Sequence, residues 1–346
     1  MFEKLKRLDF EGNIVVLPDF FLDRFIKINS KDDLFRMINS KTTIGGGSIR
    51  GVNTFDVKGG NAVNVAYCLA KMGLSVTLFT VADNIGSSIL HTIFSRFGRR
   101  INLLIKNGKH GTTTSFEFHD NGESYANVMI SDVGDNKNFG PELISLPSDF
   151  EIIKSAKSIV LTNWGSNIKG TDLAYHLFTN SPKSFHFLDP ADIETRKEEF
   201  RDTLKKLSYA IDVLSINQNE CTSLLKACNL ESRLSLDLNH IENVKVAVKT
   251  LSAEFGLKID LHTRIGAAWS DGKAVVFVNS FDTVPKKLTG SGDCWDSADL
   301  VGYFVGLDTT ERLLFSNAYA SLYIGKKEFE PPTIAEAVEF IQTQYQ

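Results

Sequence analysis

An acid stands among glycines in the segment KLTGSGDCWDSADLVGYF, residues 287–304. Gly290, Ser291 and Gly292 predict a tight turn, and the apolar spacing that follows predicts a helix beginning near Asp293. The unpaired N–H groups and the dipole of such a helix start favour an incoming phosphoryl group, which a carboxylate would repel. Asp293 is therefore interpreted as a base that accepts the proton of an attacking hydroxyl. The alternative is that Asp293 is simply the N-cap of the helix.

A second glycine-rich segment, VKGGNAVNVAYCLAKMG, covers residues 57–73. Gly59 and Gly60 let the backbone approach a ligand closely, while Asn61 and Asn64 place amides near a predicted helix start. Amides both donate and accept hydrogen bonds, which suits the hydroxyl groups of a sugar. The alternative is a loop that ends in an Asn helix cap.

The third segment is INQNE, residues 216–220. Asn217 and Glu220 are three residues apart, so they lie on one side of a helical turn that follows a predicted strand. Oxygen ligands of this kind can hold hydrated Mg²⁺ beside nucleotide phosphates. The same spacing is also a helix-capping pattern, with Asn followed three residues later by Glu.

Short apolar runs alternate with helix-period stretches along most of the chain. Strands are predicted near residues 13–26, 74–83 and 101–106, and again where KSIVLTNWG, SFHFLDPAD, IDVLSINQNE and GLKIDLHTR occur. This alternation predicts one α/β domain over residues 1–346, with a mostly parallel sheet covered by helices on both faces. Ligands bind beyond the carboxyl ends of such strands, where Asp189, Asn217 and Glu220 fall.

Segments around residues 13–25, 42–58 and 111–131 break this rhythm. The last segment alternates apolar and polar residues around HDNGES, which is a hairpin signal. Together the three segments predict a small antiparallel sheet that stands apart from the main one and covers a cleft as a lid. The alternative is a hairpin excursion without a role in binding.

Composition excludes several classes of protein. The 38 Lys and Arg residues against 42 Asp and Glu, without a basic block, argue against a nucleic-acid or anionic-membrane partner. Four dispersed cysteines indicate reduced thiols rather than a disulfide framework, and the scattered histidines lack metal-ligand spacing. No run is long and apolar enough to span a bilayer, so a cytoplasmic protein is expected.

Taken in order, the three segments resemble the ribokinase-like carbohydrate and nucleoside kinase family, also called the PfkB family. GGNAVNVAYCLAKMG resembles its amino-terminal signature, INQNE its N-x-x-E motif, and LTGSGDCWDSADLVGYFVG its carboxyl-terminal G-A-G-D signature, with Ser291 in place of alanine. The resemblance covers most of the chain. It implies a ribokinase-like fold with a small β-lid over the sugar.

By this resemblance Asp293 is the catalytic base. The backbone of Gly290, Ser291 and Gly292 is implied to form an anion hole for the transferred phosphoryl group. Asn217 and Glu220 are implied to organise Mg²⁺, through water, together with the nucleotide phosphates.

The resemblance also implies a sugar site. Its contacts are Asp23 in the first strand region, Gly59, Gly60 and Asn64. Because PDFFLD offers two acids, Asp19 is a rival to Asp23.

The nucleotide site departs from the family pattern. RLLFSNAYASLYIG, with Asn317 and Ala320, resembles the helix that lines the base pocket. The family's T-x-G-x-x-G turn has its counterpart in LHTRIGAAWSDG, which keeps Thr263 and Gly266 but lacks the first glycine. His262, Thr263 and Arg264 are candidates to serve in its place, and Arg264 could pair with phosphate. The alternative is that Arg264 is an exposed loop arginine without a ligand. The donor is accordingly expected to be ATP, with ADP left open.

The chain is therefore expected to be an Mg²⁺-dependent kinase that phosphorylates an alcohol group of a sugar, sugar derivative or nucleoside. One alternative is a non-catalytic sugar- or nucleotide-binding regulatory protein on the same fold. A dinucleotide oxidoreductase shares the alternating pattern, but no GxGxxG follows the first strand. Lid strands can also pair between two copies, so a homodimer formed through the lid is a further expectation.

Overall fold

Nine strands form the large sheet of the computed structural model, which describes residues 1–8, 10–120, 123–231 and 237–344. From β11 to β5, every neighbouring pair in the order β13-β12-β11-β10-β9-β8-β1-β4-β5 is parallel, while β12 and β13 run antiparallel at one edge. The predicted mostly parallel sheet is confirmed. Its strands are β1 (Asn13–Leu17), β4 (Ser75–Ala82), β5 (Ile101–Asn107), β8 (Ser158–Thr162), β9 (Phe185–Asp189), β10 (Val213–Asn217), β11 (Lys258–His262), β12 (Gly266–Ser270) and β13 (Val275–Asn279).

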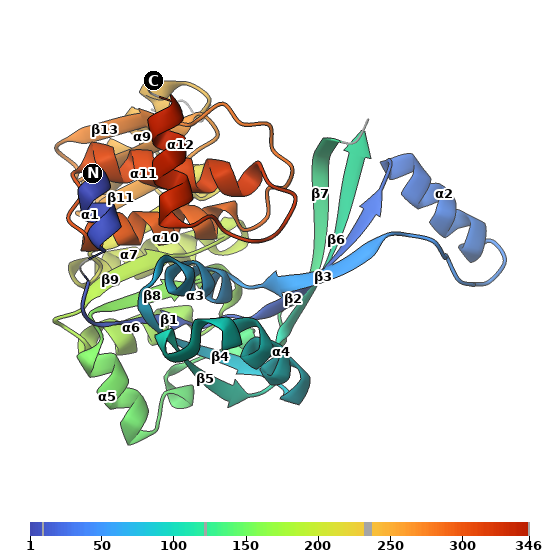
Figure 1. Cartoon of the computed structure of the whole chain (residues 1–346), viewed down its shortest axis with the longest axis horizontal. Coiled ribbons are helices and arrows are strands. Elements are labelled where there is room, and N and C mark those ends of the chain that lie inside the picture. The colour runs from blue at the N-terminus through green and yellow to red at the C-terminus, as the bar shows by residue number, and fades with distance from the viewer. Residues whose placement is uncertain (9, 121–122, 232–236, 345–346) are drawn as a thin grey trace.

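Helices cover both faces of this sheet (Figure 1). Successive side chains of a strand point to opposite faces, so Ile14 and Val16 of β1 enter one core while Val15 and Leu17 enter the other. The first core includes α1 (Phe2–Arg7), α3 (Asn61–Met72), α4 (Asn84–Phe94), α10 (Ser291–Phe304), α11 (Thr309–Ile324) and α12 (Ile334–Gln344), and the second includes α5 (Pro147–Ser155), α6 (Gly170–Asn180), α7 (Lys197–Leu207), α8 (Gln218–Ala227) and α9 (Ile241–Phe255).

A small four-stranded sheet stands to one side of this body, with α2 (Lys31–Thr42) at its far end (Figure 1). It has the order β3-β2-β6-β7, with β2 (Phe21–Ile28), β3 (Thr54–Gly59), β6 (Gly111–Asp120) and β7 (Glu123–Asp132). Phe25 of β2 stacks on Phe55 of β3 with the ring centroids 5.2 Å apart, which gives the sheet an apolar face near the body. The turn of the predicted 111–131 hairpin, at residues 121–122, lies outside the described residues.

The small sheet differs from the predicted one in three respects. Residues 13–17 belong to the large sheet, since the apolar run of β1 is buried on both faces, and only β2 enters the small sheet. Most of the 42–58 segment is not strand, since α2 ends at Thr42 and β3 begins only at Thr54. The sheet is also mixed, since β2 and β6 are parallel.

Polar residues gather where the parallel strands end. Asp189, Asn217 and His262 are the last residues of β9, β10 and β11, and Asp19 lies two residues beyond β1. Helices α3, α8 and α10 begin at this same edge of the sheet, so their N-terminal N–H groups face the ends of these strands.

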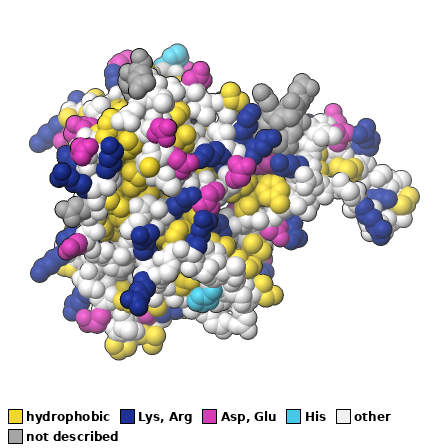
Figure 2. All heavy atoms as spheres, viewed as in Figure 1, with side chains coloured by type: hydrophobic (Ala, Val, Ile, Leu, Met, Phe, Trp, Pro, Cys, Tyr) yellow, Lys and Arg dark blue, Asp and Glu magenta, His cyan; other side chains and the backbone are white. Residues whose placement is uncertain are grey.

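In the view of Figure 2, Lys and Arg side chains are interspersed with Asp and Glu over the surface. Within the part of the chain that the structure describes, no helix is both long and apolar enough to cross a bilayer.

Candidate active site

The GSGD turn leads directly into α10. Gly290 is the N-cap of this helix with φ at 81°, so Asp293 is its third residue and not its cap. The predicted start near Asp293 was two residues late, because the left-handed conformation at Gly290 lets the helix begin at Ser291. The Ser291 N–H donates to the Leu288 carbonyl at 3.2 Å, whereas Gly292 lines a cleft together with Asp293.

Asp293 is almost fully buried, with 6% of its surface exposed. Its Oδ2 accepts a hydrogen bond from Asn64 Nδ2 at 2.8 Å, and Asn64 Oδ1 in turn accepts one from Lys58 Nζ at 2.7 Å. Burial raises the pKa of Asp293 well above its ordinary value, and the nearby Asp189 raises the pKa further. A carboxylate with a raised pKa that is held by a single amide is chemically suited to take up a proton.

The two rival acids of PDFFLD occupy different environments. Asp19 accepts hydrogen bonds from the N–H groups of Asn61 and Ala62 at 2.8 and 3.0 Å, and from two side chains at the carboxyl end of β8, those of Thr162 and Asn163. With these four donors it anchors the start of α3, so Asp19 is committed to structure.

Asp23 lies in β2 of the small sheet and is 6% exposed. Burial raises its pKa to about 6, against the opposing effect of a hydrogen bond with Thr113. The carboxylate lies directly against Gly59, where an added Cβ would lie 2.1 Å from Asp23 Oδ2, so a larger residue there would displace this carboxylate. Of the two acids, Asp23 is the one whose geometry fits a substrate contact.

Gly60 also needs to be glycine. Its φ is 92°, and an added Cβ would lie 2.7 Å from the Asp19 carbonyl oxygen. The two glycines thus bring β3, the first turn of α3 and the β1–β2 connection into close contact, which places Asn64 against Asp293.

Asn217 and Glu220 form a capping box at the start of α8. Asn217 Oδ1 accepts from the N–H groups of Asn219 and Glu220, while Glu220 Oε2 and Oε1 accept from Asn217 N and Nδ2 at 2.7 and 2.6 Å. Burial, with Asp189 nearby, raises the pKa of Glu220 well above its ordinary value. The capping interpretation is therefore correct. Both residues also line a cleft, so they remain available to a ligand there.

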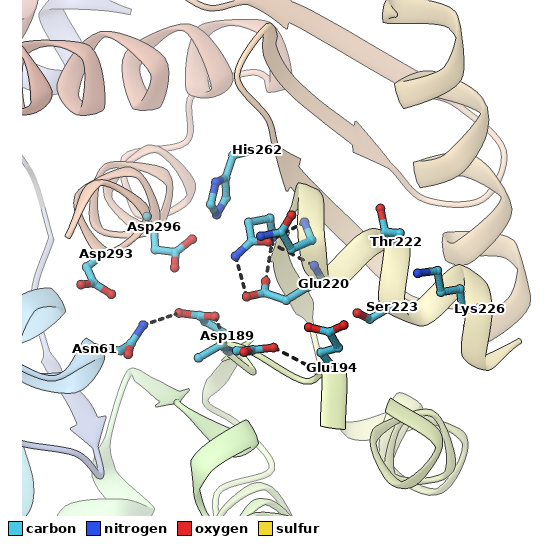
Figure 3. A pocket seen from close by; sticks show the side chains of 15 residues that line it. Asn61, Asp189, Glu194, Glu220, Thr222, Ser223, Lys226, His262, Asp293 and Asp296 are labelled. Atoms are coloured by element: carbon cyan, nitrogen blue, oxygen red, sulfur yellow. Dashed lines mark hydrogen bonds between the residues drawn. The ribbon is translucent and has the colours of Figure 1, made fainter. Parts of the chain in front are cut away.

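The cleft has a volume of about 460 Å³ and a strongly acidic wall (Figure 3). Asp293 and Asn61 lie on one side, Asp189 in the middle, and Thr222, Ser223 and Lys226 of α8 on the far side. The acids that line it are Asp189, Asp192, Glu194, Glu220, Asp293 and Asp296.

Asp296 is a site residue that the sequence patterns did not predict, whereas His262, predicted as a phosphate contact, does line the cleft. Asp296 is buried, accepts a hydrogen bond from Ser215 Oγ at 2.5 Å, and lies one helical turn beyond Asp293, so the three-residue spacing was an available signal. His262 stacks near Trp295 with the ring centroids 5.1 Å apart, and burial lowers its pKa to about 4. Its imidazole is therefore neutral at physiological pH.

Unlike Asn217 and Glu220, the other residues predicted to bind the nucleotide do not line this cleft; they are Thr263, Arg264, Gly266, Asn317 and Ala320. Thr263 donates through both N and Oγ1 to the Gly266 carbonyl at 2.8 Å, which closes the turn between β11 and β12, and Arg264 in that turn is exposed. The Asn317 amide donates to the carbonyls of Val278 and Asn279 and accepts from Trp295 Nε1, so it joins α11 to β13 and α10. Ala320 packs in the apolar cluster beside them.

The cleft offers carboxylate oxygens, which are the ligands that magnesium prefers. Among the described residues, no three His, Cys, Asp or Glu side chains are grouped to hold a metal directly. Hydrated Mg²⁺ does not require such a cage, since it keeps several waters and is bound through one or two carboxylates and substrate phosphates. The acids of the cleft fit that mode of binding.

Comparisons with solved structures agree with this architecture. Arabidopsis thaliana ribokinase, complexed with ribose and ATP, aligns with a TM-score of 0.74 and 18% identity over 96% of this chain and 99% of its own. Adenosine kinase from Sinorhizobium meliloti aligns at 0.73 with 16% identity over 96% and 100%. A protein from E. coli in complex with ATP and Mg²⁺ aligns at 0.70 with 15% identity over 96% and 98%.

At these identities the structural matches establish the ribokinase-like fold alone. A search of curated protein sequences finds no match. The family model described as pfkB family carbohydrate kinase, however, matches residues 39–334, which is most of the chain. The protein therefore belongs to the PfkB family of carbohydrate kinases.

Proposed function

We propose that this protein is a magnesium-dependent kinase that transfers the terminal phosphoryl group of ATP to an alcohol group of a sugar, sugar derivative or nucleoside. The observation that carries the proposal is the Asp293 carboxylate in the first turn of α10. It is buried, has a raised pKa and accepts a hydrogen bond from Asn64 of α3. Membership of the PfkB family supports the same class of reaction.

In this proposal Asp293 is the general base. It removes the proton from the acceptor hydroxyl as that oxygen forms a bond to the terminal phosphorus, while the bond from phosphorus to the donor's bridging oxygen breaks. The phosphorylated alcohol and the shortened nucleotide leave, and Asp293 returns its proton to solvent. The N–H groups at the start of α10, behind Gly290 and Ser291, would stabilise the charge on the transferred group.

The acceptor would lie on the Asp23 side of Asp293 and the nucleotide on the Glu220 side. Asp23, Gly59, Gly60 and Asn64 come from the small sheet and the start of α3, and the small sheet would act as a lid that excludes water. Thr263, Arg264, Gly266, Asn317 and Ala320 remain candidates for contacts with the nucleotide through the elements β11–β12 and α11.

Asn217, Glu220 and the neighbouring acids would hold Mg²⁺ through water at the phosphate end of the cleft. When bound, the ion would neutralise the negative charge of the nucleotide phosphates, which the acidic wall would otherwise repel. A cation requirement is therefore part of the proposal.

The proposal is tested by measuring nucleotide consumption and acceptor phosphorylation over a panel of sugars and nucleosides, with ATP and with ADP as donor. Asp293→Asn keeps the size of the side chain but loses the base, so turnover should fall by about 10²–10⁴-fold with acceptor binding largely preserved. Asp282→Asn, at an exposed position outside the cleft, is the matched control and should behave as wild type.

A non-catalytic binding protein predicts a different result. It would be stabilised by a sugar or a nucleotide in a thermal-shift measurement, yet no donor would be consumed with any acceptor. Wild-type turnover by Asp293→Asn would instead retain the kinase but remove Asp293 as its base.

A further inference from the structure

Lys287 is a buried cation just before the GSGD turn. Only 3% of its surface is exposed, whereas the adjacent Lys286 is exposed. The Lys287 ammonium donates to the backbone carbonyls of Tyr323 at 2.6 Å, Lys326 at 2.7 Å and Glu328 at 2.5 Å. An ammonium has three protons to donate, so all of its donors are used by carbonyl oxygens and none by a carboxylate.

These three carbonyls converge on one cation. The Tyr323 carbonyl belongs to the last turn of α11, which ends at Ile324, and the helix dipole makes this end negative. Lys287 Nζ also lies 4.0 Å from the centroid of the Tyr323 ring, which adds a cation–π contact. The loop after α11 is therefore folded around one positive charge.

Tyr323 connects this charge to the anion-binding turn. Its carbonyl accepts from Lys287, while its hydroxyl donates to the Thr289 carbonyl at 3.1 Å. An added Cβ on Gly290 would lie 2.9 Å from the same hydroxyl, so the ring packs directly against the turn. The Lys286 N–H donates to the Ile324 carbonyl at 2.7 Å and ties the two segments a second time.

The same loop reaches the small sheet. Phe329 lies 5.5 Å from Lys287 Nζ, measured to its ring centroid. Its ring also packs against Phe25 of β2 at 4.9 Å and Phe55 of β3 at 5.8 Å. The loop around Lys287 thus contacts both the turn that would hold the phosphoryl group and the strands that would cover the acceptor.

We propose that Lys287 is a positioning residue, a built-in monovalent cation that organises the carbonyls of the 323–328 loop and through Tyr323 holds the Gly290–Gly292 turn in its anion-binding shape. The inference rests on the proposed phosphoryl transfer, in which that turn stabilises the transferred group. It follows that the wild-type enzyme requires no free monovalent cation here, whereas a variant without the ammonium does, because backbone carbonyls can coordinate K⁺ or NH₄⁺ in its place.

The test compares Lys287→Ala with Lys286→Ala in buffers of equal ionic strength that contain tetramethylammonium, potassium or ammonium chloride. In tetramethylammonium, which is too large for the space, Lys287→Ala should lose about 100-fold in kcat because the turn is misplaced, with a smaller change in the acceptor KM. Potassium or ammonium should raise the kcat of Lys287→Ala at least tenfold above its value in tetramethylammonium. Wild type and Lys286→Ala should be insensitive to the choice of cation.

Thermal unfolding of the same samples gives a readout that is independent of activity. Potassium or ammonium should raise the Tm of Lys287→Ala but leave that of wild type unchanged. Unchanged kcat in Lys287→Ala, or a loss that no cation restores, would overturn the positioning role. If wild type transfers no phosphoryl group to any acceptor, the proposed function fails and the positioning role with it, while the Tm series still reports whether the carbonyls bind a cation.

If Lys287→Ala does not fold, the pH profile of wild-type kcat tests the positioning role of Lys287 instead. Burial lowers the pKa of Lys287 to about 8, against the opposing influence of Cys294 and Glu328, and Lys326 lowers it further. The charged form is present below that pKa and is lost above it, so kcat should fall as pH rises through about 8. Burial raises the pKa values of Cys294 and Tyr323, which keeps both uncharged in this range. A flat profile from pH 7.5 to about 9.5 would refute the role.

Discussion

The two glycines of the GSGD turn should fail in different ways when they are replaced by alanine. Gly290 has a φ of 81°, where an L side chain costs about 1–2 kcal/mol. Its added Cβ would also lie 2.9 Å from the Tyr323 hydroxyl, so this group must move and lose its hydrogen bond to the Thr289 carbonyl, which is worth about 1 kcal/mol. Gly290→Ala should therefore lower the free energy of unfolding by roughly 2–3 kcal/mol.

Gly292 is the matched control for stability. It lies within α10 without a positive φ, and an added Cβ would meet His262 Cε1 at 3.4 Å, which is ordinary contact. Gly292→Ala should leave stability within about 0.5 kcal/mol or raise it slightly, since alanine favours a helix. Because Gly292 lines the cleft, its new methyl group should instead lower kcat by about tenfold or more, as one obstructed anion-hole donor would.

The assay is urea-induced unfolding followed by fluorescence, run beside steady-state kinetics on both variants. We expect a large loss of stability for Gly290→Ala and a large loss of turnover at near wild-type stability for Gly292→Ala. A Gly290→Ala variant as stable as wild type would refute the strain assigned to Gly290, and a wild-type kcat in Gly292→Ala would refute the anion-hole role of Gly292.

Two further predictions concern the base and the small sheet. Asn64 donates a hydrogen bond to the charged form of Asp293, so Asn64→Ala should raise the Asp293 pKa further. The acid limb of the kcat profile should therefore shift to higher pH. At acidic pH the kcat should be about tenfold below that of wild type, the equivalent of one hydrogen bond to a charged group. A log kcat against pH plot checks this, and an acid limb identical to wild type would contradict it. We also propose that copies pair through the small sheet, whose β7 exposes Val128, Met129 and Ile130. Ile130→Lys should convert a dimer to a monomer in light scattering while Ile85→Lys, equally exposed on α4, should not; a wild-type monomer would rule the pairing out.

Local patterns were sufficient for most elements of the fold. The helix predicted over 61–73 is α3 (Asn61–Met72), and the apolar runs that end in Asp189, Asn217 and His262 are three neighbouring parallel strands. These elements are set by local signals, namely strand and helix periodicity, glycine stops and capping residues. Each signal acts within a few positions, so it can be recognised from the sequence alone.

Sequence patterns failed where the outcome depended on which distant part of the chain a segment meets. The apolar stretch after residue 13 reads as a single strand, but its first half is buried in the large sheet and its second half pairs with β3 and β6. Likewise, nothing in the spacing distinguished Asp19 from Asp23. The difference lies in their partners, since Asp19 accepts hydrogen bonds from the start of α3 and from the end of β8 some 140 positions away, whereas Asp23 faces Gly59.

By itself, the sequence determined the alternating α/β architecture, the family and the three segments that form the candidate site. Those features rest on short-range geometry and on residue types that few other roles require. Only the tertiary structure decided that Asn64 holds Asp293 from 229 positions away, that Asn317 is used in packing, and that Lys287 lies in a cage of carbonyls. These outcomes depend on burial and on which distant groups meet, and a buried polar group takes its chemistry from its partners rather than from its neighbours along the chain.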